Sequence, residues 1–188
     1  MTELALPKID KKTLEKKDYI FKSLAKIINP EHVLSHKDEI KPYETDGLSA
    51  YKQTPLAVVM PENTKEVSSI LKFCYEENIK VVPRGAGTGL SGGALPLQDA
   101  VLLSLGKFNK ILDIDFENKC VVTQPGVTNL GLTHAVQHKG FYYAPDPSSQ
   151  LACSIGGNVA ENSGGVHSLK YGLSLIHISE PTRRRGIS

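Results

Sequence analysis

The sequence predicts an α+β fold from three observations. An amphipathic helix is expected near the N-terminus, a strand–helix–strand unit follows at 56–83, and three more strand candidates come later with only one helix after them. A uniform βαβ protein would instead alternate strands and helices along its length. The 188 residues, 40% of them hydrophobic, suffice for one domain or two small ones with a buried core.

Residues 12–28 form the first predicted helix, because apolar side chains recur mostly three or four positions apart with lysine and glutamate between them. Asn29 and Pro30 end it, since the residue before a proline is pushed out of the helical region. Residues 31–52 are polar, include the turn-like sequence Tyr-Glu-Thr-Asp-Gly at 43–47, and predict only short pieces of structure.

The strand–helix–strand unit is clearly marked. The apolar run at 56–60 predicts a strand that Pro61 closes. Asn63 followed by Glu66 resembles a capping box and predicts a helix to about Asn78. Residues 79–83 then predict a buried strand.

The rest of the chain predicts a strand meander and one helix. Strands are expected at 100–105, 110–115 and 119–124, and Thr128 can cap a helix that runs to about Lys139. A subdomain boundary is expected at 106–110, after the glycine-rich segment and with the strands of the meander on both sides of it.

Charge and cysteine content exclude several classes of protein. Of the 22 basic and 20 acidic residues, three and one lie in 173–188, which leaves a neutral body with 19 of each. Such a body does not predict nucleic-acid binding. The three cysteines form no CxxC pair, so neither a disulfide framework nor a zinc or iron–sulfur site is expected. No segment resembles a signal peptide or membrane span, and the cytoplasm is the expected location.

Glycine is concentrated in one part of the chain. Of the 16 glycines, 14 lie between positions 85 and 172, and five lie within 85–93, directly after a predicted strand. Successive backbone N–H groups in glycine-permitted conformations form a concave site for an anion, so a phosphate is the expected ligand. Only Arg84 adds charge, and Thr88 and Ser91 offer hydroxyl donors, so binding mainly through backbone amides is expected.

Other interpretations of this loop stay open. The loop lacks the lysine of the Walker phosphate-binding motif. Residues 87–92 match the GxGxxG dinucleotide fingerprint, but Pro96 and the predicted strand at 100–105 leave no room for the helix that follows it in a Rossmann fold. A surface loop without a ligand is the other alternative, and its glycines would cost about 0.5–1 kcal/mol each. Residues 141–149 and 154–165 combine small and polar side chains that predict either a second wall for a flat ring or a pair of tight turns.

Four sequence blocks resemble the FAD-linked oxidase family in their residues, order and spacing. Within this family they are most similar to the flavin subunits of glycolate oxidase. They are PRGAGTGLSGG at 83–93, QPGVTNL at 124–130, YYAPDPSSQ at 142–150 and SIGGNVAENSGGVHSLKYG at 154–172. The resemblance spans about 21–172. It implies the FAD-binding PCMH-type fold, also called the vanillyl-alcohol oxidase type, in which FAD lies between two α+β subdomains, here incomplete at the C-terminus.

The resemblance also implies domain limits. Residues 1–51 would be a helical and extended lead-in, 52–172 a partial FAD-binding domain, and 173–188 a non-native tail that resembles translated sequencing-adapter read-through. A divergent C-terminus or a basic localisation tail is the alternative for the last segment.

The same resemblance assigns two sets of residues to FAD. The backbone of one loop would hold the pyrophosphate, namely Arg84, Gly85, Ala86, Gly87, Thr88, Gly89, Leu90 and Ser91. A second set would lie along the flavin and its ribityl chain, namely Pro145, Asp146, Ser149, Ser154, Gly156, Gly157, Asn158, Ala160 and Gly165. The loop contains no histidine for covalent attachment, so non-covalent FAD is expected.

The activity implied by the resemblance is oxidation of a 2-hydroxy acid such as glycolate or D-lactate by hydride transfer to flavin. The catalytic residues are expected in a C-terminal substrate domain that these residues do not include, so the chain alone is expected to be inactive. Other FAD-binding and iron–sulfur subunits of a glycolate oxidase complex are the implied partners. A non-catalytic nucleotide-binding module and a Rossmann NAD-binding protein remain alternatives.

Some residue patterns resemble metal-binding or nucleophilic sites, but we do not expect such sites here. The pairs His32 with His36 and His134 with His138 have metal-binding spacing, but exposed or core-edge histidines are the commoner reason and no metal site is expected. Cys153 and Ser163 have no evident base partner for nucleophilic catalysis. Tyr142 and Tyr143 are expected to pack beside the flavin or in the core.

Overall fold

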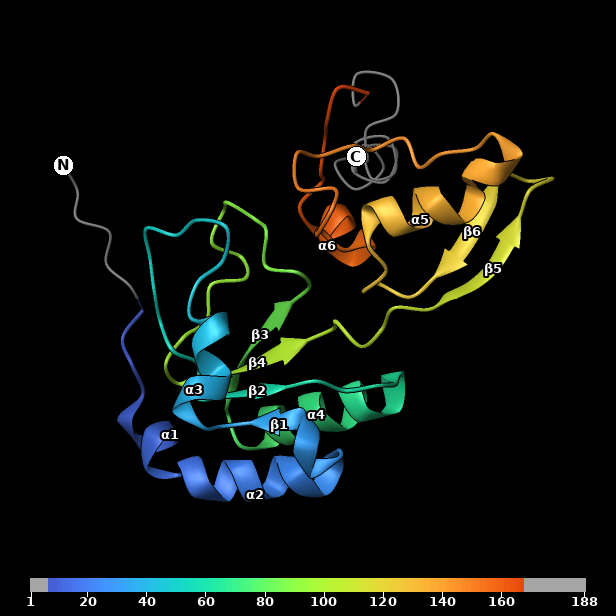
Figure 1. The fold of residues 1–188 in the computed structure, drawn as a ribbon. Helices are drawn as coiled ribbons and strands as arrows, with labels where there is room; N and C mark the ends of the chain where they lie inside the picture. Colours follow the sequence, from blue (N-terminus) through green and yellow to red (C-terminus); the bar gives the residue numbers. More distant parts are fainter. Residues whose placement is uncertain (1–6, 168–188) are drawn as a thin grey trace, which may run out of the picture. The chain divides into compact units, whose positions relative to one another are not determined.

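The computed structural model describes residues 7–167 (Figure 1). The predicted tail at 173–188 lies outside the described residues. The chain divides into two compact units between Lys107 and Phe108, within the segment where the sequence predicts a subdomain boundary. The limits of 1–51, 52–172 and 173–188 stay predictions.

The first unit contains a four-stranded sheet and its covering helices. Its elements are α1 (Lys11–Glu15), α2 (Lys17–Ile27), η1 (Pro30–His32), β1 (Val33–Leu34), α3 (Lys37–Ile40), η2 (Lys41–Tyr43), β2 (Ala57–Val59), α4 (Thr64–Glu76), β3 (Lys80–Arg84) and β4 (Ala100–Ser104). The strand order is β1-β2-β4-β3, with β1 antiparallel to β2 and the other pairs parallel.

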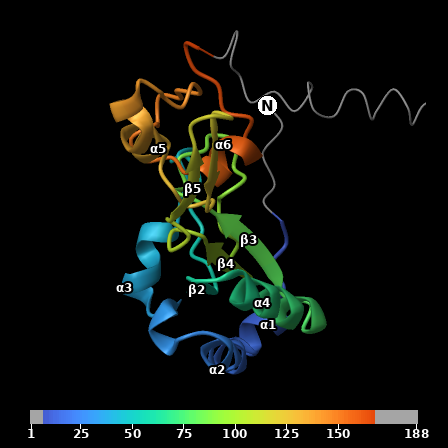
Figure 2. The same ribbon diagram turned by 90° about the vertical axis from the view of Figure 1, so that its right-hand side faces the viewer.

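Each face of this sheet has its own cover. On one face, α2 supplies Ile20 and Leu24 and α4 supplies Ile70 to a core that includes Val59 and Leu103. Figure 2 shows α2 and α4 next to each other at the sheet. The other face is covered by α3 and η2, whose Ile40 and Tyr43 pack with side chains of β2 and β4. Burial of these apolar side chains is the main stabilising contribution in this unit.

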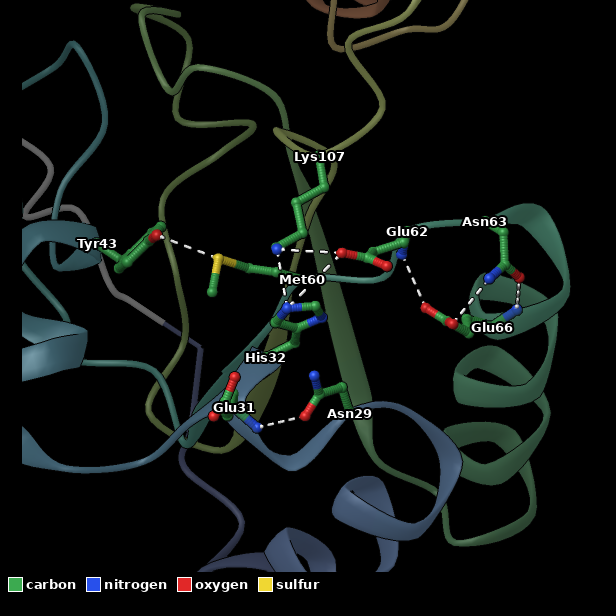
Figure 3. Close-up of polar contacts among 9 residues, drawn as sticks. All are labelled: Asn29, Glu31, His32, Tyr43, Met60, Glu62, Asn63, Glu66 and Lys107. Atoms are coloured by element: carbon green, nitrogen blue, oxygen red, sulfur yellow. Dashed lines mark hydrogen bonds and ion pairs between the residues drawn. The ribbon is translucent and has the colours of Figure 1, made fainter.

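Local signals placed several elements correctly. Asn63 Oδ1 accepts a 2.9 Å hydrogen bond from the Glu66 N–H at the start of α4 (Figure 3). Glu66 Oε2 completes the cap by accepting from the Glu62 N–H at 2.8 Å, one residue before the N–H that a capping box uses.

Two expectations in this unit need correction, and one is confirmed. The first helix is interrupted at Lys16, because Asp10 caps a short α1 that ends there before α2 begins. The two-residue strand β1 confirms the expectation of only short pieces of structure in residues 31–52. Strand β3 is not buried along its length, because it is an edge strand that pairs only with β4 within the described residues. An edge position also accommodates Pro83, which has no N–H to donate.

The second unit contains a hairpin and two helices. Strands β5 (Ile111–Asp115) and β6 (Cys120–Thr123) pair antiparallel, followed by α5 (Asn129–Val136), η3 (Gln137–Lys139) and α6 (Ile155–Ala160). As predicted, Thr128 caps α5, with its Oγ1 accepting from the Gly131 N–H at 3.1 Å. Helix α6 lies where a wall or tight turns were expected. Among residues 7–167, none of the helices has the length and apolar character to cross a membrane.

Candidate functional site

Polar side chains gather at the carboxyl edge of the parallel strands in the first unit. The strand register puts His32, Met60, Ser104 and Arg84 in one row on the face that α3 and η2 cover. The Tyr43 hydroxyl donates to Met60 Sδ over 3.9 Å (Figure 3). The loop that carries the first of the two predicted sets of FAD-binding residues begins at the end of this row, at Arg84.

The row begins beside a cluster of polar and charged side chains, formed by His32, Glu62 and Lys107. Lys107 Nζ lies 2.8 Å from His32 Nε2 and 3.3 Å from Glu62 Oε1 (Figure 3). Because an ammonium group can only donate, this contact requires His32 Nε2 to accept. His36 lies 3.8 Å from Asp38 instead, so the pair His32 and His36 do not share a partner. His138 of the other pair packs edge-on against Phe116.

The glycine-rich loop presents unpaired amides. The N–H groups of Gly85, Ala86, Gly87, Thr88, Gly89 and Leu90 donate no hydrogen bond to any residue that the structure describes. Gly87 and Gly92 have φ of +73° and +80°, which favour glycine. No helix lies between β3 and β4, so the Rossmann interpretation is wrong: the last glycine of GxGxxG opens no helix here.

Arg84 has a structural environment that the sequence did not reveal. Its side chain is buried, and its Nη1 donates to the carbonyl oxygens of Thr45 at 2.7 Å and Ala94 at 3.3 Å. Its Cζ lies 5.7 Å from the centre of the Tyr43 ring. Burial lowers the pKa of Arg84, opposed by the charge of Asp46 and by Tyr43. The guanidinium therefore holds the loop to the turn at Thr45.

In the second unit, Asn129 orders the segment that contains Pro145 and Asp146. The Asn129 side chain is 1% exposed and donates through Nδ2 to the Pro145 carbonyl oxygen at 2.7 Å. Asn129 is not among the predicted site residues, although an asparagine directly after the predicted cap residue Thr128 is a visible signal in the sequence. Ser149 forms the next turn, where its carbonyl oxygen accepts from Cys153 at 2.8 Å.

Asp146 is held by the end of the described chain. Its Oδ1 accepts from the His167 N–H at 3.2 Å, and its Oδ2 lies 2.9 Å from His167 Nδ1. Gly165 approaches so closely that a Cβ there would overlap the Asp146 carbonyl and carboxylate. The structure therefore brings these two predicted residues together.

Helix α6 carries the remaining predicted residues. Ser154 caps it, with Oγ accepting from the Gly157 N–H at 3.2 Å, while the Gly156 N–H donates to the Pro125 carbonyl at 2.8 Å. These amides therefore already have protein partners. Asn158 is 0% exposed, and neither its Oδ1 nor its Nδ2 has a hydrogen-bond partner among residues 7–167, whereas Ala160 is exposed at the end of the helix. A buried amide without partners costs about 1–3 kcal/mol, which favours a ligand-related role for Asn158.

A separate cavity of about 260 Å³ lies against the hairpin in the second unit. Phe116, Phe141 and Tyr143 are among its lining residues, and none of the residues predicted to bind FAD lines it. Burial and the nearby Cys153 raise the pKa of Tyr143. Tyr142 is 56% exposed and also reaches the cavity, so both tyrosines pack near an apolar space.

Comparisons with known proteins agree with this geometry. A family model described as FAD binding domain matches residues 55–180. The chain is 51% identical over 174 residues to "Glycolate oxidase subunit GlcD" of Escherichia coli strain K12, which covers 93% of the chain and 34% of that relative. It is 37% identical over 183 residues to "D-lactate dehydrogenase" of Anaerostipes hadrus, which covers 97% of the chain and 37% of that relative.

The fold has solved counterparts. The structure matches that of p-cresol methylhydroxylase with a TM-score of 0.70 and 22% identity, over 82% of this chain and 30% of that one. The α+β, PCMH-type FAD-binding fold class implied by the sequence blocks is thereby confirmed. The chain spans about a third of the length of the curated relatives that it matches.

Proposed function

The chain belongs to the family of FAD-binding domains, and from this premise we propose that residues 84–91 hold the pyrophosphate of a non-covalently bound FAD. The observation that carries the proposal is the run of six unpaired amides, from Gly85 to Leu90, among the described residues. Successive N–H groups without partners suit a doubly charged diphosphate. Arg84 would act mainly by holding the loop, since its Nη1 already donates to two carbonyls.

Residues of the second unit would hold the flavin and its ribityl chain. The buried amide of Asn158 supports this assignment, because its oxygen can accept from an N–H and its nitrogen can donate to an acceptor on the polar edge of a flavin. Gly165 brings backbone close to Asp146. The proposed set is Pro145, Asp146, Ser149, Ser154, Gly156, Gly157, Asn158, Ala160 and Gly165.

We propose that the whole protein oxidises a 2-hydroxy acid such as glycolate or D-lactate. The names of the two relatives above support this substrate class. FAD, when bound, would accept the hydride that leaves the α-carbon of the acid. The residues that bind the carboxylate and take the hydroxyl proton would lie outside these 188 residues. A cytoplasmic location and partner subunits of a glycolate oxidase complex, including an iron–sulfur subunit, belong to the same proposal.

FAD titration of the purified chain tests the proposed cofactor. Quenching of flavin fluorescence should saturate at a single FAD per chain, and ADP should compete only weakly, because it lacks the flavin contacts. Equal affinity for ADP and FAD would favour a general nucleotide-binding module. Absence of any FAD binding by the folded chain would contradict the proposal.

Two glycine variants test the loop itself. Gly87→Ala places a Cβ against the buried Arg84 guanidinium, whereas Gly92→Ala, at a similarly positive φ, meets no atom within 4 Å. Both variants carry the same backbone penalty, so they differ in this overlap. Gly87→Ala should weaken FAD binding by about tenfold relative to Gly92→Ala, the effect of losing one charge-assisted hydrogen bond. Equal affinities would contradict the assignment of this loop.

A further inference from the structure

The turn at 45–47 lies against the glycine-rich loop although it precedes the matched FAD-binding segment, which begins at residue 55. A Cβ on Gly47 would lie 2.5 Å from the Thr88 carbonyl oxygen and 2.7 Å from the Gly89 carbonyl oxygen. Atoms cannot approach so closely without displacement of the backbone. Position 47 therefore requires glycine because the backbone of the loop leaves no space for a Cβ, and not because of a positive φ.

This contact fixes the direction of two peptide groups. The Thr88 carbonyl oxygen is closer to the Gly47 Cβ position than its carbon, at 2.5 against 2.9 Å, so the oxygen points toward the turn. In a planar trans peptide the N–H of the next residue points the opposite way. The N–H groups of Gly89 and Leu90 therefore point away from the turn.

Buried charges hold the turn in this place. Arg84 Nη1 donates to the Thr45 carbonyl at 2.7 Å and to the Ala94 carbonyl at 3.3 Å, which joins the turn to both ends of the loop. Asp46 is 6% exposed; its Oδ1 accepts from the Leu48 N–H at 2.9 Å, and its Oδ2 has no hydrogen-bond partner in the described part of the chain. Its negative charge favours the charged form of Arg84.

We infer that Thr45, Asp46 and Gly47 form a positioning element of the anion site, which aims the Gly89 and Leu90 N–H groups at the ligand. Gly47 acts by contact and Asp46 by its charge beside Arg84. This inference rests on the proposed function, since it deepens the assignment of the pyrophosphate to this loop. None of the three residues needs to touch FAD for it to hold.

NMR of the ¹⁵N-labelled full chain with pyrophosphate as the probe tests the inference without enzyme activity. In the wild type, pyrophosphate should shift the amide resonances of Gly89 and Leu90. Gly47→Ala should displace these resonances in the free protein and weaken pyrophosphate binding by about tenfold. The matched control is Gly106→Ala in the same unit, whose Cβ would meet only Ser104 Oγ at 3.7 Å.

A second variant keeps the test valid if Gly47→Ala does not fold. Asp46→Asn preserves the shape and the Leu48 contact but removes the charge, and should weaken pyrophosphate binding severalfold. The inference would be overturned if both variants bound pyrophosphate with wild-type affinity, or if Asp46→Asn did so when Gly47→Ala is unfolded. It would also be overturned if pyrophosphate did not shift the Gly89 and Leu90 resonances of the wild type. Pyrophosphate binding without FAD binding would instead retain the inference and reject the proposed cofactor.

Discussion

Lys80 and Asp99 form an ion pair at the amino ends of β3 and β4, with Lys80 Nζ 2.7 Å from Asp99 Oδ2. The Asp99 side chain is 3% exposed, and the same oxygen accepts a 2.7 Å hydrogen bond from the backbone N–H of Asp10. The carboxylate therefore joins the start of α1 to two strands that flank the glycine-rich loop. Its loss would loosen both the N-terminal helix and the end of that loop.

Asp99→Asn should lower stability in a pH-dependent manner. Burial alone would raise the pKa of Asp99, but hydrogen bonds from Lys80 and the Asp10 N–H and the Lys80 charge outweigh it, so the pKa lies below its usual value of 3.8. The carboxylate is thus favoured in the folded state. Its stabilising contribution is present above the unfolded pKa and is lost as the pH falls through the lower folded pKa.

Urea unfolding of both proteins between pH 7 and pH 2.5 measures this contribution. At pH 7 the variant should be less stable by about 1–2 kcal/mol, a value reduced by the 45% exposure of the Lys80 side chain. The difference should shrink below pH 3.8. Asp113→Asn, at an exposed position of β5, is the control and should change little. A difference that is constant with pH would exclude the ion pair as its cause.

The three cysteines should differ in reactivity. Burial raises the pKa of the Cys74 thiol to about 11, and its side chain is 1% exposed, so it offers little thiolate near pH 8 and little access. Cys153 is also buried, whereas Cys120 is exposed. A thiol-specific chromogenic reagent should therefore modify one cysteine rapidly in the native chain and all three after denaturation.

Cys120→Ser identifies the reactive group. This variant should lose the rapid phase, while Cys74→Ser should keep it. Rapid modification of Cys74 in the native protein would mean that the core between α4 and the sheet opens readily, contrary to the packing described above.

Local signals predicted the elements whose stabilising contacts are close in sequence. Asn63 and Thr128 cap helices through N–H groups three residues away, and the sequence placed both helices. The density of glycines also marked the loop between β3 and β4, in which the N–H groups of residues 85–90 have no partner among the described residues. Short-range hydrogen-bond patterns are visible in a sequence because their donors and acceptors lie within one turn.

Contacts distant in sequence account for the features that the sequence did not predict. Helix α6 contains two glycines and therefore has a weak helical propensity. Its first N–H groups donate to the carbonyl oxygens of Pro125 and Val127, some thirty residues earlier in the chain, so tertiary contacts stabilise it. Likewise, the Arg84 contact with Thr45 spans 39 positions. The edge position of β3 depends on the order of strands, which local pattern does not encode.

Asn129 should be a strong determinant of stability in the second unit. Asn129→Ala leaves the Pro145 carbonyl oxygen without its 2.7 Å donor and opens space at a side chain that is 1% exposed. The free energy of unfolding should fall by about 1–3 kcal/mol, the cost of a buried acceptor without a partner. Denaturant unfolding measures it, with Gln137→Ala at an exposed position as the control. Equal stability of the two variants would mean that the Pro145 segment does not depend on Asn129.

Gly156→Ala should destabilise the protein although alanine favours helices. In an exposed helix this replacement gains about 1 kcal/mol. Here the new Cβ would lie 2.7 Å from Pro125 Cβ and 3.1 Å from the Pro125 carbonyl oxygen, which accepts the Gly156 N–H bond. The overlap involves a proline ring and backbone, neither of which can rotate away. We expect a net loss of about 1–3 kcal/mol, as for overpacking of a core.

The adjacent glycine provides the matched control. A Cβ at Gly157 would meet only Ser154 Oγ, at 3.1 Å, and a serine hydroxyl can shift. Gly157→Ala should therefore change the thermal unfolding temperature less than Gly156→Ala, at the same helix and with the same gain in propensity. If both variants unfold at the same temperature, the approach of α6 to Pro125 does not limit the residue at position 156. If Gly156→Ala alone is destabilised, the close contact requires glycine, and the family block that contains it has a packing reason at this position.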